Sequence, residues 1–179
     1  MARFVELRRH TDNDGDVLSD EGVAAALRLG AGLAGGYRVA VSTGAQRATQ
    51  TVGCLLAGLG RPVPDGVVVE PGLRSEREDR WRAIANEADG DDLAAMRSVD
   101  PGFVDEEAAT LGAALGRVLE RLGDGDRALA VGHSPTNEAA LLGLTGQLVA
   151  PLAKGAGVLV TADEGGFRIE PLDPEPGAP

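Results

Sequence analysis

Short runs of β-branched and aliphatic residues alternate along the chain with longer segments whose apolar residues recur at helical spacing. The runs favour strands and the longer segments favour amphipathic helices. We expect strands over residues 3–7, 37–43, 67–69 and 127–133, and a closing hairpin from residues 155–162 and 166–172. We expect helices over residues 19–33, 45–59 and 105–122, another opened by Pro135, and a charged helical excursion within residues 72–102. This alternation predicts an α/β fold whose sheet is covered on both faces.

The ends of the first predicted helix are marked by residues that suit those positions. Ser19 supplies a side-chain cap, and Asp20 and Glu21 place negative charge in the first turn. Gly35 and Gly36 end the helix before the next predicted strand. Local chemistry and hydrophobic periodicity therefore predict the same element.

The length of the chain predicts one domain. A chain of 179 residues with 43% hydrophobic residues can bury one core, and no internal repeat divides it. We expect residues 1–172 to form this domain. Residues 173–179, DPEPGAP, are rich in proline and polar residues and are expected to form a flexible tail.

Composition excludes several classes of partner. The net charge of −11 repels nucleic acid and anionic membranes, and 3% aromatic residues leave few surfaces for base stacking. The sequence has no long apolar run and its first residues do not form a secretory signal, so we expect a cytoplasmic protein. The single cysteine, Cys54, lies in an apolar helical stretch, which is typical of a buried residue.

Polar clusters occur where three of the predicted strands end. Arg9 and His10 follow the first strand, Ser42 and Arg47 the second, and His133 ends the strand over residues 127–133. In open α/β sheets, ligands bind beyond the carboxyl ends of the strands. We therefore expect these residues to share one crevice.

The clustered residue types suit a phosphoryl group. His10 follows two arginines, a setting that favours the neutral, nucleophilic imidazole. Arg9 and Arg47 have planar guanidinium groups that match phosphate oxygens, and a helix beginning near Ala45 would direct backbone N–H groups at the same anion. Each residue alone is typical of a surface charge or a structural hydrogen bond, but their combination favours phosphoryl chemistry.

Three blocks of the sequence resemble the histidine phosphatase superfamily, which includes cofactor-dependent phosphoglycerate mutases, small phosphohistidine phosphatases and broad phosphomonoesterases. The segment VELRRH at residues 5–10 is similar to the family's strand followed by Arg-His. STGAQRATQT at residues 42–51 resembles the second block, and VGH at residues 131–133 resembles the block with the second histidine. The blocks occur in the family's order and the resemblance extends over residues 3 to about 144.

The resemblance implies a phosphoglycerate mutase-like fold: three layers, with a mostly parallel central sheet and helices on both faces. It also implies a metal-independent phosphatase that forms a phosphohistidine intermediate on His10. Arg9, Arg47 and His133 would bind the phosphoryl oxygens and offset developing charge. We expect no cofactor and no metal, because side chains supply the positive charge.

Two features depart from the family pattern. Thr11 stands where the family usually has glycine, so its side chain either crowds the phosphate or donates its hydroxyl to it; Thr11 and Ser42 are our candidate substrate-binding residues. Residues 12–16 lack the threonine and asparagine spacing of the mutases, which ranks mutase activity lower.

The proton donor is the residue that the sequence defines least. Mutase-type members have a glutamate shortly after a Leu-Arg pair, and here Leu73-Arg74 is followed by Glu76 and Glu78. We take Glu76 as the first candidate and Glu78 as the second; a solvated role for Glu76 has equal weight. Small phosphohistidine phosphatases lack a clear acid at this position.

Several alternatives remain open at this stage. The substrate is either a small phosphomonoester or a phosphohistidine protein. The chain could instead be a degenerate member that binds a phosphorylated ligand as a regulatory module, or a phosphoglycerate mutase-type phosphotransferase. The sequence does not decide between a monomer and a homodimer.

Overall fold

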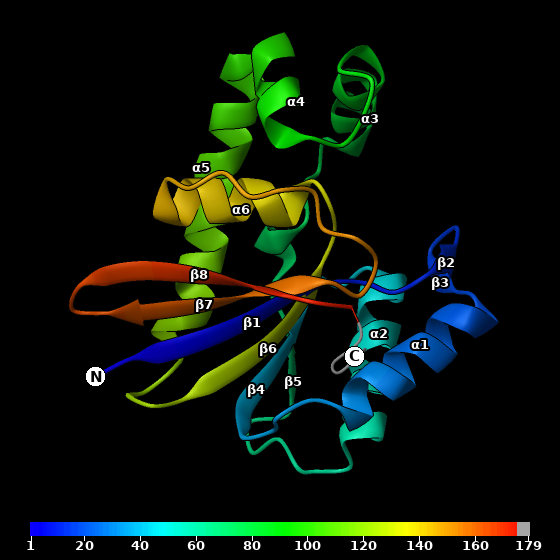
Figure 1. The fold of residues 1–179 in the computed structure, drawn as a ribbon, viewed down its shortest axis with the longest axis vertical. Helices are drawn as coiled ribbons and strands as arrows, with labels where there is room; N and C mark the ends of the chain where they lie inside the picture. The colour runs from blue at the N-terminus through cyan, green and yellow to red at the C-terminus, as the bar shows by residue number, and fades with distance from the viewer. Residues whose placement is uncertain (175–179) are drawn as a thin grey trace.

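A six-stranded sheet forms the centre of the computed structural model, which describes residues 1–174 (Figure 1). Its strands are β1 (Arg3–Arg9), β4 (Tyr37–Ser42), β5 (Val67–Val69), β6 (Arg127–Gly132), β7 (Gly157–Asp163) and β8 (Gly166–Leu172). They lie in the order β5-β4-β6-β1-β7-β8. The first four in this order are parallel, whereas β7 and β8 are antiparallel to their neighbours. The sheet is mostly parallel, as predicted.

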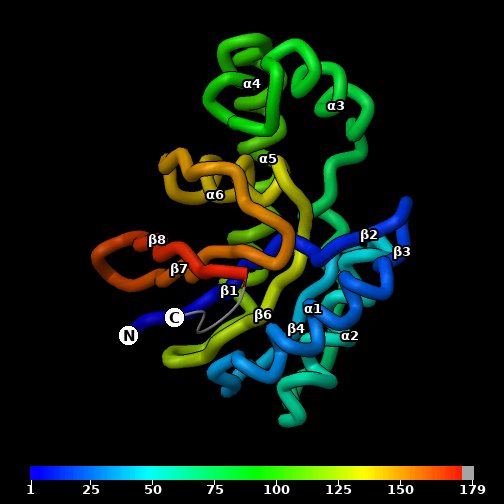
Figure 2. Tube along the Cα trace, turned by 45° about the vertical axis from the view of Figure 1, so that its right-hand side comes forward, coloured from blue at the N-terminus to red at the C-terminus, as the bar shows by residue number. Residues whose placement is uncertain are grey.

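Helices cover both faces of the sheet (Figure 1). Helices α1 (Asp20–Ala31) and α2 (Gln46–Leu59) lie on one face, and α5 (Pro101–Glu120) and α6 (Thr136–Thr145) lie on the other. The short 3-10 helix η1 (Pro71–Leu73) leads to α3 (Glu78–Glu87) and α4 (Leu93–Val99), which pack near the outer end of α5 (Figure 2). These layers confirm the predicted α/β fold class. Within residues 1–174, no helix is long and apolar enough to cross a membrane.

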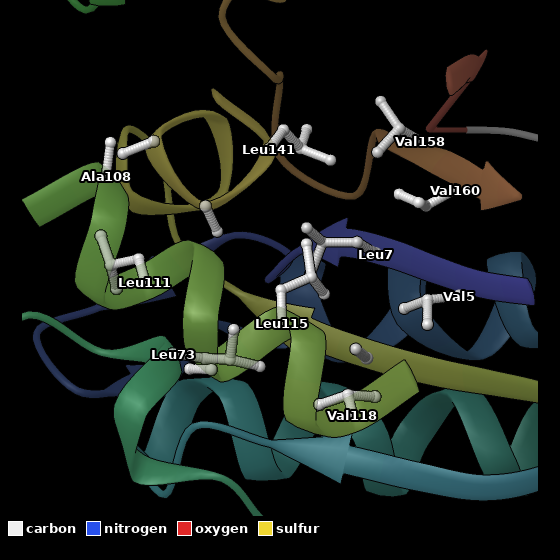
Figure 3. Close-up of a cluster of buried hydrophobic side chains, with 14 of the residues drawn as sticks. Val5, Leu7, Leu73, Ala108, Leu111, Leu115, Val118, Leu141, Val158 and Val160 are labelled. Atoms are coloured by element: carbon white, nitrogen blue, oxygen red, sulfur yellow. The ribbon is translucent and has the colours of Figure 1, made fainter. Parts of the chain in front are cut away.

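Strand β6 shows how the sheet separates two hydrophobic clusters. Successive side chains of a strand point to opposite faces. Ala128 and Ala130 join the cluster under α5 and α6, whereas Leu129 and Val131 join the cluster under α1 and α2. Figure 3 shows the larger cluster, where side chains of β1 and β7 meet those of α5 and α6. A strand that is buried on both faces carries a nearly continuous apolar run, which is why the sequence predicts β6 well.

A buried polar network lies on the α1 and α2 side of β1. The Glu6 carboxylate accepts hydrogen bonds from Arg8 Nε and from the Tyr37 hydroxyl, each at 2.6 Å. Arg8 Nη1 also donates to the carbonyl oxygens of Gly155 at 2.8 Å and of Asp173 at 2.9 Å. The chain after β8 is thereby tied to β1. Of the tail predicted at residues 173–179, residues 175–179 lie outside the described residues.

Three details differ from the predicted elements. A two-stranded ribbon, β2 (Asn13–Asp14) and β3 (Val17–Leu18), occupies the loop after β1; strands of this length leave no periodicity in a sequence. Helix α5 begins at Pro101 because the Asp100 side chain accepts a hydrogen bond from the Phe103 N–H and caps it. Helix α1 ends at Ala31.

Candidate active site

The two histidines lie side by side at the carboxyl edge of the sheet. His10 directly follows β1 and His133 directly follows β6, and these strands are parallel neighbours. The backbone N–H of His10 donates a hydrogen bond to the carbonyl oxygen of Gly132 at 3.0 Å. The ring centroids are 5.3 Å apart and the ring planes are inclined by 59°. The topology thus brings together residues that are far apart in the sequence.

The environment of His10 fixes both its tautomer and its charge. Its Nδ1 lies 2.8 Å from the carbonyl oxygen of Thr11, which only accepts hydrogen bonds, so Nδ1 carries the proton and Nε2 keeps a lone pair. Burial lowers the pKa of His10 to about 4, and the charges of Arg47, Arg9 and Lys154 act in the same direction. At neutral pH, His10 is a neutral imidazole with Nε2 available as a nucleophile.

His133 is also neutral. Burial lowers its pKa to about 3, and the charge of Arg47 adds to the effect. Its Nε2 lies 2.9 Å from the hydroxyl oxygen of Thr43, and its buried Nδ1 has no hydrogen-bond partner among residues 1–174. His133 is therefore placed to act by hydrogen bonding, whereas cationic side chains supply the positive charge at the site.

The two predicted phosphate-binding arginines each have an internal partner. Arg47 Nη1 lies 2.7 Å from Asp16 Oδ1, and Asp16 Oδ2 accepts a hydrogen bond of 3.3 Å from the Gln46 N–H at the start of α2. Arg9 Nη1 donates to the carbonyl oxygen of Leu152 at 2.8 Å, while its buried Nε has no partner within the described chain. The N-terminus of α2, which we predicted to bind an external anion, thus holds the Asp16 carboxylate.

Thr11 and Ser42 serve the loops around the site. The Thr11 hydroxyl donates to the Gly22 carbonyl oxygen at 2.8 Å, so its proton is directed at α1 and not at a phosphate. The Ser42 side chain is fully buried, where it contacts the Thr49 hydroxyl at 2.7 Å and accepts the Gly44 N–H at 3.0 Å. The geometry gives these two candidate substrate-binding residues structural contacts instead.

A cleft of about 290 Å³ extends from His133 beneath α3. Arg47, Glu78, Trp81 and Pro135 are among the residues that line it. Glu78 Oε1 accepts a hydrogen bond from Arg74 Nε at 2.7 Å. Glu76, our first candidate for the acid, lines neighbouring clefts but not this one. The structure therefore brings the second candidate, Glu78, to the cleft that contains His133.

Helix α3 is held over the cleft by a carboxylate of α5. Glu107 is buried and accepts hydrogen bonds from the Ser75 hydroxyl and from Trp81 Nε1, the latter at 3.1 Å. Trp81 also packs edge-to-face against Phe103, with ring centroids 5.0 Å apart. Because these contacts are internal, the wall of the cleft is formed before any ligand binds.

Sequence reasoning missed several residues at the site. Thr43 contacts His133, and Asp16 contacts Arg47. Glu138 of α6 is fully buried, and its Oε1 accepts hydrogen bonds from Ser134 Oγ at 2.6 Å and from the Leu152 N–H at 2.8 Å. Burial raises the pKa of Glu138. Thr43 could have been predicted as a site residue because it follows Ser42 at a strand end. Glu138 could not, because a glutamate within a helix has no sequence signal of a buried role.

The part of the chain that the structure describes contains no group of three or more His, Cys, Asp or Glu side chains placed to hold a metal ion.

Solved structures share this fold. Phosphoglycerate mutase from Bacillus anthracis str. Sterne is 16% identical, with a TM-score of 0.71 over 97% of this chain and 93% of that chain. A mycobacterial glucosyl-3-phosphoglycerate phosphatase is 16% identical, with a TM-score of 0.65 over 96% and 99%. The protein histidine phosphatase SixA, solved with tungstate, is 21% identical, with a TM-score of 0.59 over 97% of each chain. No family model and no curated sequence matches the chain.

The chain has the phosphoglycerate mutase-like α/β fold of these solved structures. Within that fold, the structure places an adjacent histidine pair and two arginines at the carboxyl edge of the sheet.

Proposed function

We propose that this protein is a metal-independent phosphatase that hydrolyses phosphomonoesters through a phosphohistidine intermediate on His10. The observation that carries the proposal is the state of His10. Its Nδ1 proton is donated to Thr11, its pKa is lowered to about 4, and the second histidine lies beside it. A purely ligand-binding module has no chemical use for a neutral nucleophile held beside arginines.

The first step transfers the phosphoryl group to His10. The Nε2 lone pair forms a P–N bond while the P–O bond of the ester breaks, and the leaving oxygen takes the electron pair and a proton. Arg47 and Arg9 stabilise the charge on the phosphoryl oxygens, and His133 adds a hydrogen bond. In the second step, the oxygen of water forms a new P–O bond, the P–N bond breaks, and its electron pair returns to Nε2.

We assign the proton transfers to Glu78. It lines the cleft with His133 and is held there by Arg74. In its acid form it protonates the leaving oxygen, and in its carboxylate form it accepts the proton that water loses in the second step. The net reaction therefore returns Glu78 to its starting state.

The cleft supports a small phosphorylated molecule as the substrate. Its volume of about 290 Å³ is at the lower end of the range for small-molecule sites. Trp81, Ala85 and Pro135 supply apolar surface beside His133, where the organic part of an ester would lie.

Turnover of an aryl phosphate by the purified protein tests this function. We expect hydrolysis that persists in the presence of a chelator and is abolished in His10→Ala. An active His10→Ala variant would contradict the nucleophile, and loss of activity with chelator would contradict the metal-independent mechanism. Absence of any turnover by the wild-type protein against aryl, small-metabolite and phosphohistidine substrates would instead favour a regulatory binding module.

A further inference from the structure

The carboxylate of Asp16 already contacts the protein groups that would bind the phosphoryl group of the substrate in the proposed reaction. Asp16 lies in the turn between β2 and β3, and half of its side chain is exposed. One of its oxygens lies 2.7 Å from Arg47 Nη1 and the other accepts the Gln46 N–H at 3.3 Å. Although burial opposes ionisation, hydrogen bonds from Gln46 and Arg47 hold the pKa of Asp16 below its usual range. The Asp16 side chain is therefore an anion at neutral pH.

Arg47 lies close enough to the reacting centre for this contact to matter. Its charge acts on His10 and on His133, lowering the pKa of both, and its guanidinium lines the cleft together with His133. A phosphoryl group transferred to His10 would thus approach Arg47 and the Asp16 carboxylate together. Attraction to the guanidinium is then opposed by like-charge repulsion.

Other cations around the site are also paired with acids. Lys154, the only lysine in the chain, lies 2.5 Å from Asp12, and Arg74 lies 2.7 Å from Glu78. Arg9 makes no ion pair within residues 1–174, and the two histidines are neutral. Arg47 and Lys154 are therefore paired with carboxylates before a ligand arrives. A site of this kind favours a ligand with little negative charge.

We propose that Asp16 makes the site select a singly charged phosphoryl group over a doubly charged one. The Asp16 carboxylate competes with the phosphoryl group for Arg47 and for the backbone N–H at the start of α2, and a doubly charged group is repelled more strongly. This inference rests on the proposed function, since it assumes that the phosphoryl group binds at His10. A phosphomonoester loses its second proton near pH 6, so both its singly and its doubly charged forms are present in the physiological pH range. Both histidines stay neutral across that range and do not contribute to the pH dependence.

Binding of inorganic phosphate, measured by calorimetry and by the fluorescence of Trp81, tests the inference without turnover. Trp81 is the only tryptophan and lies in the wall of the cleft. At about pH 8, where phosphate is mainly a dianion, we expect Asp16→Asn to bind it about tenfold more tightly than the wild type. At about pH 5.5, where the monoanion dominates, the difference should shrink to a few-fold. Asp14→Asn, an exposed change in the same ribbon, should behave as the wild type.

Equal or weaker phosphate binding by Asp16→Asn at the higher pH would overturn the inference, as would an affinity gain that is the same at both pH values. Asp16→Ala should show the same gain, which separates removal of the charge from new contacts of the asparagine amide. If neither the wild type nor Asp16→Asn binds phosphate at either pH, the proposed function itself fails. Phosphate binding that is insensitive to Asp16 leaves the proposed function intact and removes only this inference.

Discussion

The buried histidines link the chemistry of the site to the stability of the protein. In the folded state the pKa is about 4 for His10 and about 3 for His133, against 6.5 for an unperturbed histidine. Between pH 6.5 and about 4, the unfolded chain therefore binds more protons than the folded chain. The free energy of unfolding rises with pH wherever the unfolded state binds more protons. The contribution of the histidines is thus fully present above pH 6.5 and is lost as the pH falls.

We predict that acid destabilises the wild-type protein more than a double variant, His10→Asn with His133→Asn. Urea unfolding at pH 7.5 and at about pH 5 measures this difference. The wild type should lose a free energy of unfolding of the order of a few kcal/mol over this interval, and the double variant should lose less. An equal loss in both proteins would show that the histidines are not held neutral by the fold.

The two glutamates after Leu73-Arg74 make a matched test of the proton donor. Glu78 lines the cleft that contains His133 and Glu76 does not. Glu78→Gln should lower kcat for an alkyl phosphate by roughly 10²–10⁴-fold, whereas Glu76→Gln should leave it near the wild-type value. The loss should be smaller for an aryl phosphate, whose leaving group needs less protonation. A large loss in Glu76→Gln alone would restore the first candidate.

The sequence predicted the residues that follow strands, but not the partners that come from other segments. His10, Arg47 and His133 could be placed together because the carboxyl ends of parallel strands share one edge. The acid could not be placed, because the choice between Glu76 and Glu78 depends on where α3 begins. The contact of Asp16 with Arg47 joins residues 31 positions apart through a ribbon that has no sequence signal.

At the scale of elements, the close crossing of α5 and α6 depends on glycine. A Cβ placed on Gly143 would lie 1.8 Å from the carbonyl oxygen of Ala108, and a Cβ on Gly112 would lie 2.5 Å from the carbonyl carbon of Gly143. Backbone atoms cannot yield as a flexible side chain does. The crossing fixes α6, whose N-terminal end follows His133, so it bears on the site as well as on the core.

We predict that Gly143→Ala lowers the free energy of unfolding by about 1–3 kcal/mol or more, because α5 and α6 must move apart. Gly53→Ala in α2 is the matched control. It is also a mid-helix change, its Cβ would meet nothing within 4 Å, and it should stabilise by about 0.5–1 kcal/mol. Denaturant unfolding measures the change in the free energy of unfolding for both variants. No change in Gly143→Ala would show that the helix crossing can relax.

Elements with strong local signals were predicted well. The Ser19 side chain accepts a hydrogen bond from the Gly22 N–H, as the predicted cap requires, and β4, β5 and β6 begin where their apolar runs begin. Boundaries that depend on single side-chain contacts were harder to predict. Helix α5 begins at Pro101, earlier than predicted, because Asp100 caps it. The excursion over residues 72–102 forms η1, α3 and α4, and Trp81 of α3 donates a hydrogen bond to the buried Glu107.

Across the whole molecule, an acidic chain surrounds a site built from cations and neutral histidines. The net charge is −11, yet Arg9, Arg47, Arg74 and Lys154 gather near the histidine pair. Strand order explains this arrangement, because β4, β6 and β1 are neighbours and their carboxyl ends deliver Thr43, His133 and His10 to one edge. The fold creates the site, and α3 forms a wall of the cleft that contains His133.

Trapping the phosphoenzyme tests whether His10 is the nucleophile. The wild-type protein would be mixed with a phosphomonoester carrying labelled phosphorus and quenched within one turnover in alkali or in acid. We predict a label that survives alkali, is lost in acid, and maps to His10 by peptide analysis. It should be absent from His10→Ala and remain on His10 in His133→Asn. A label that survives acid, or one that maps to His133 or to a carboxylate, would show that His10 is not the nucleophile.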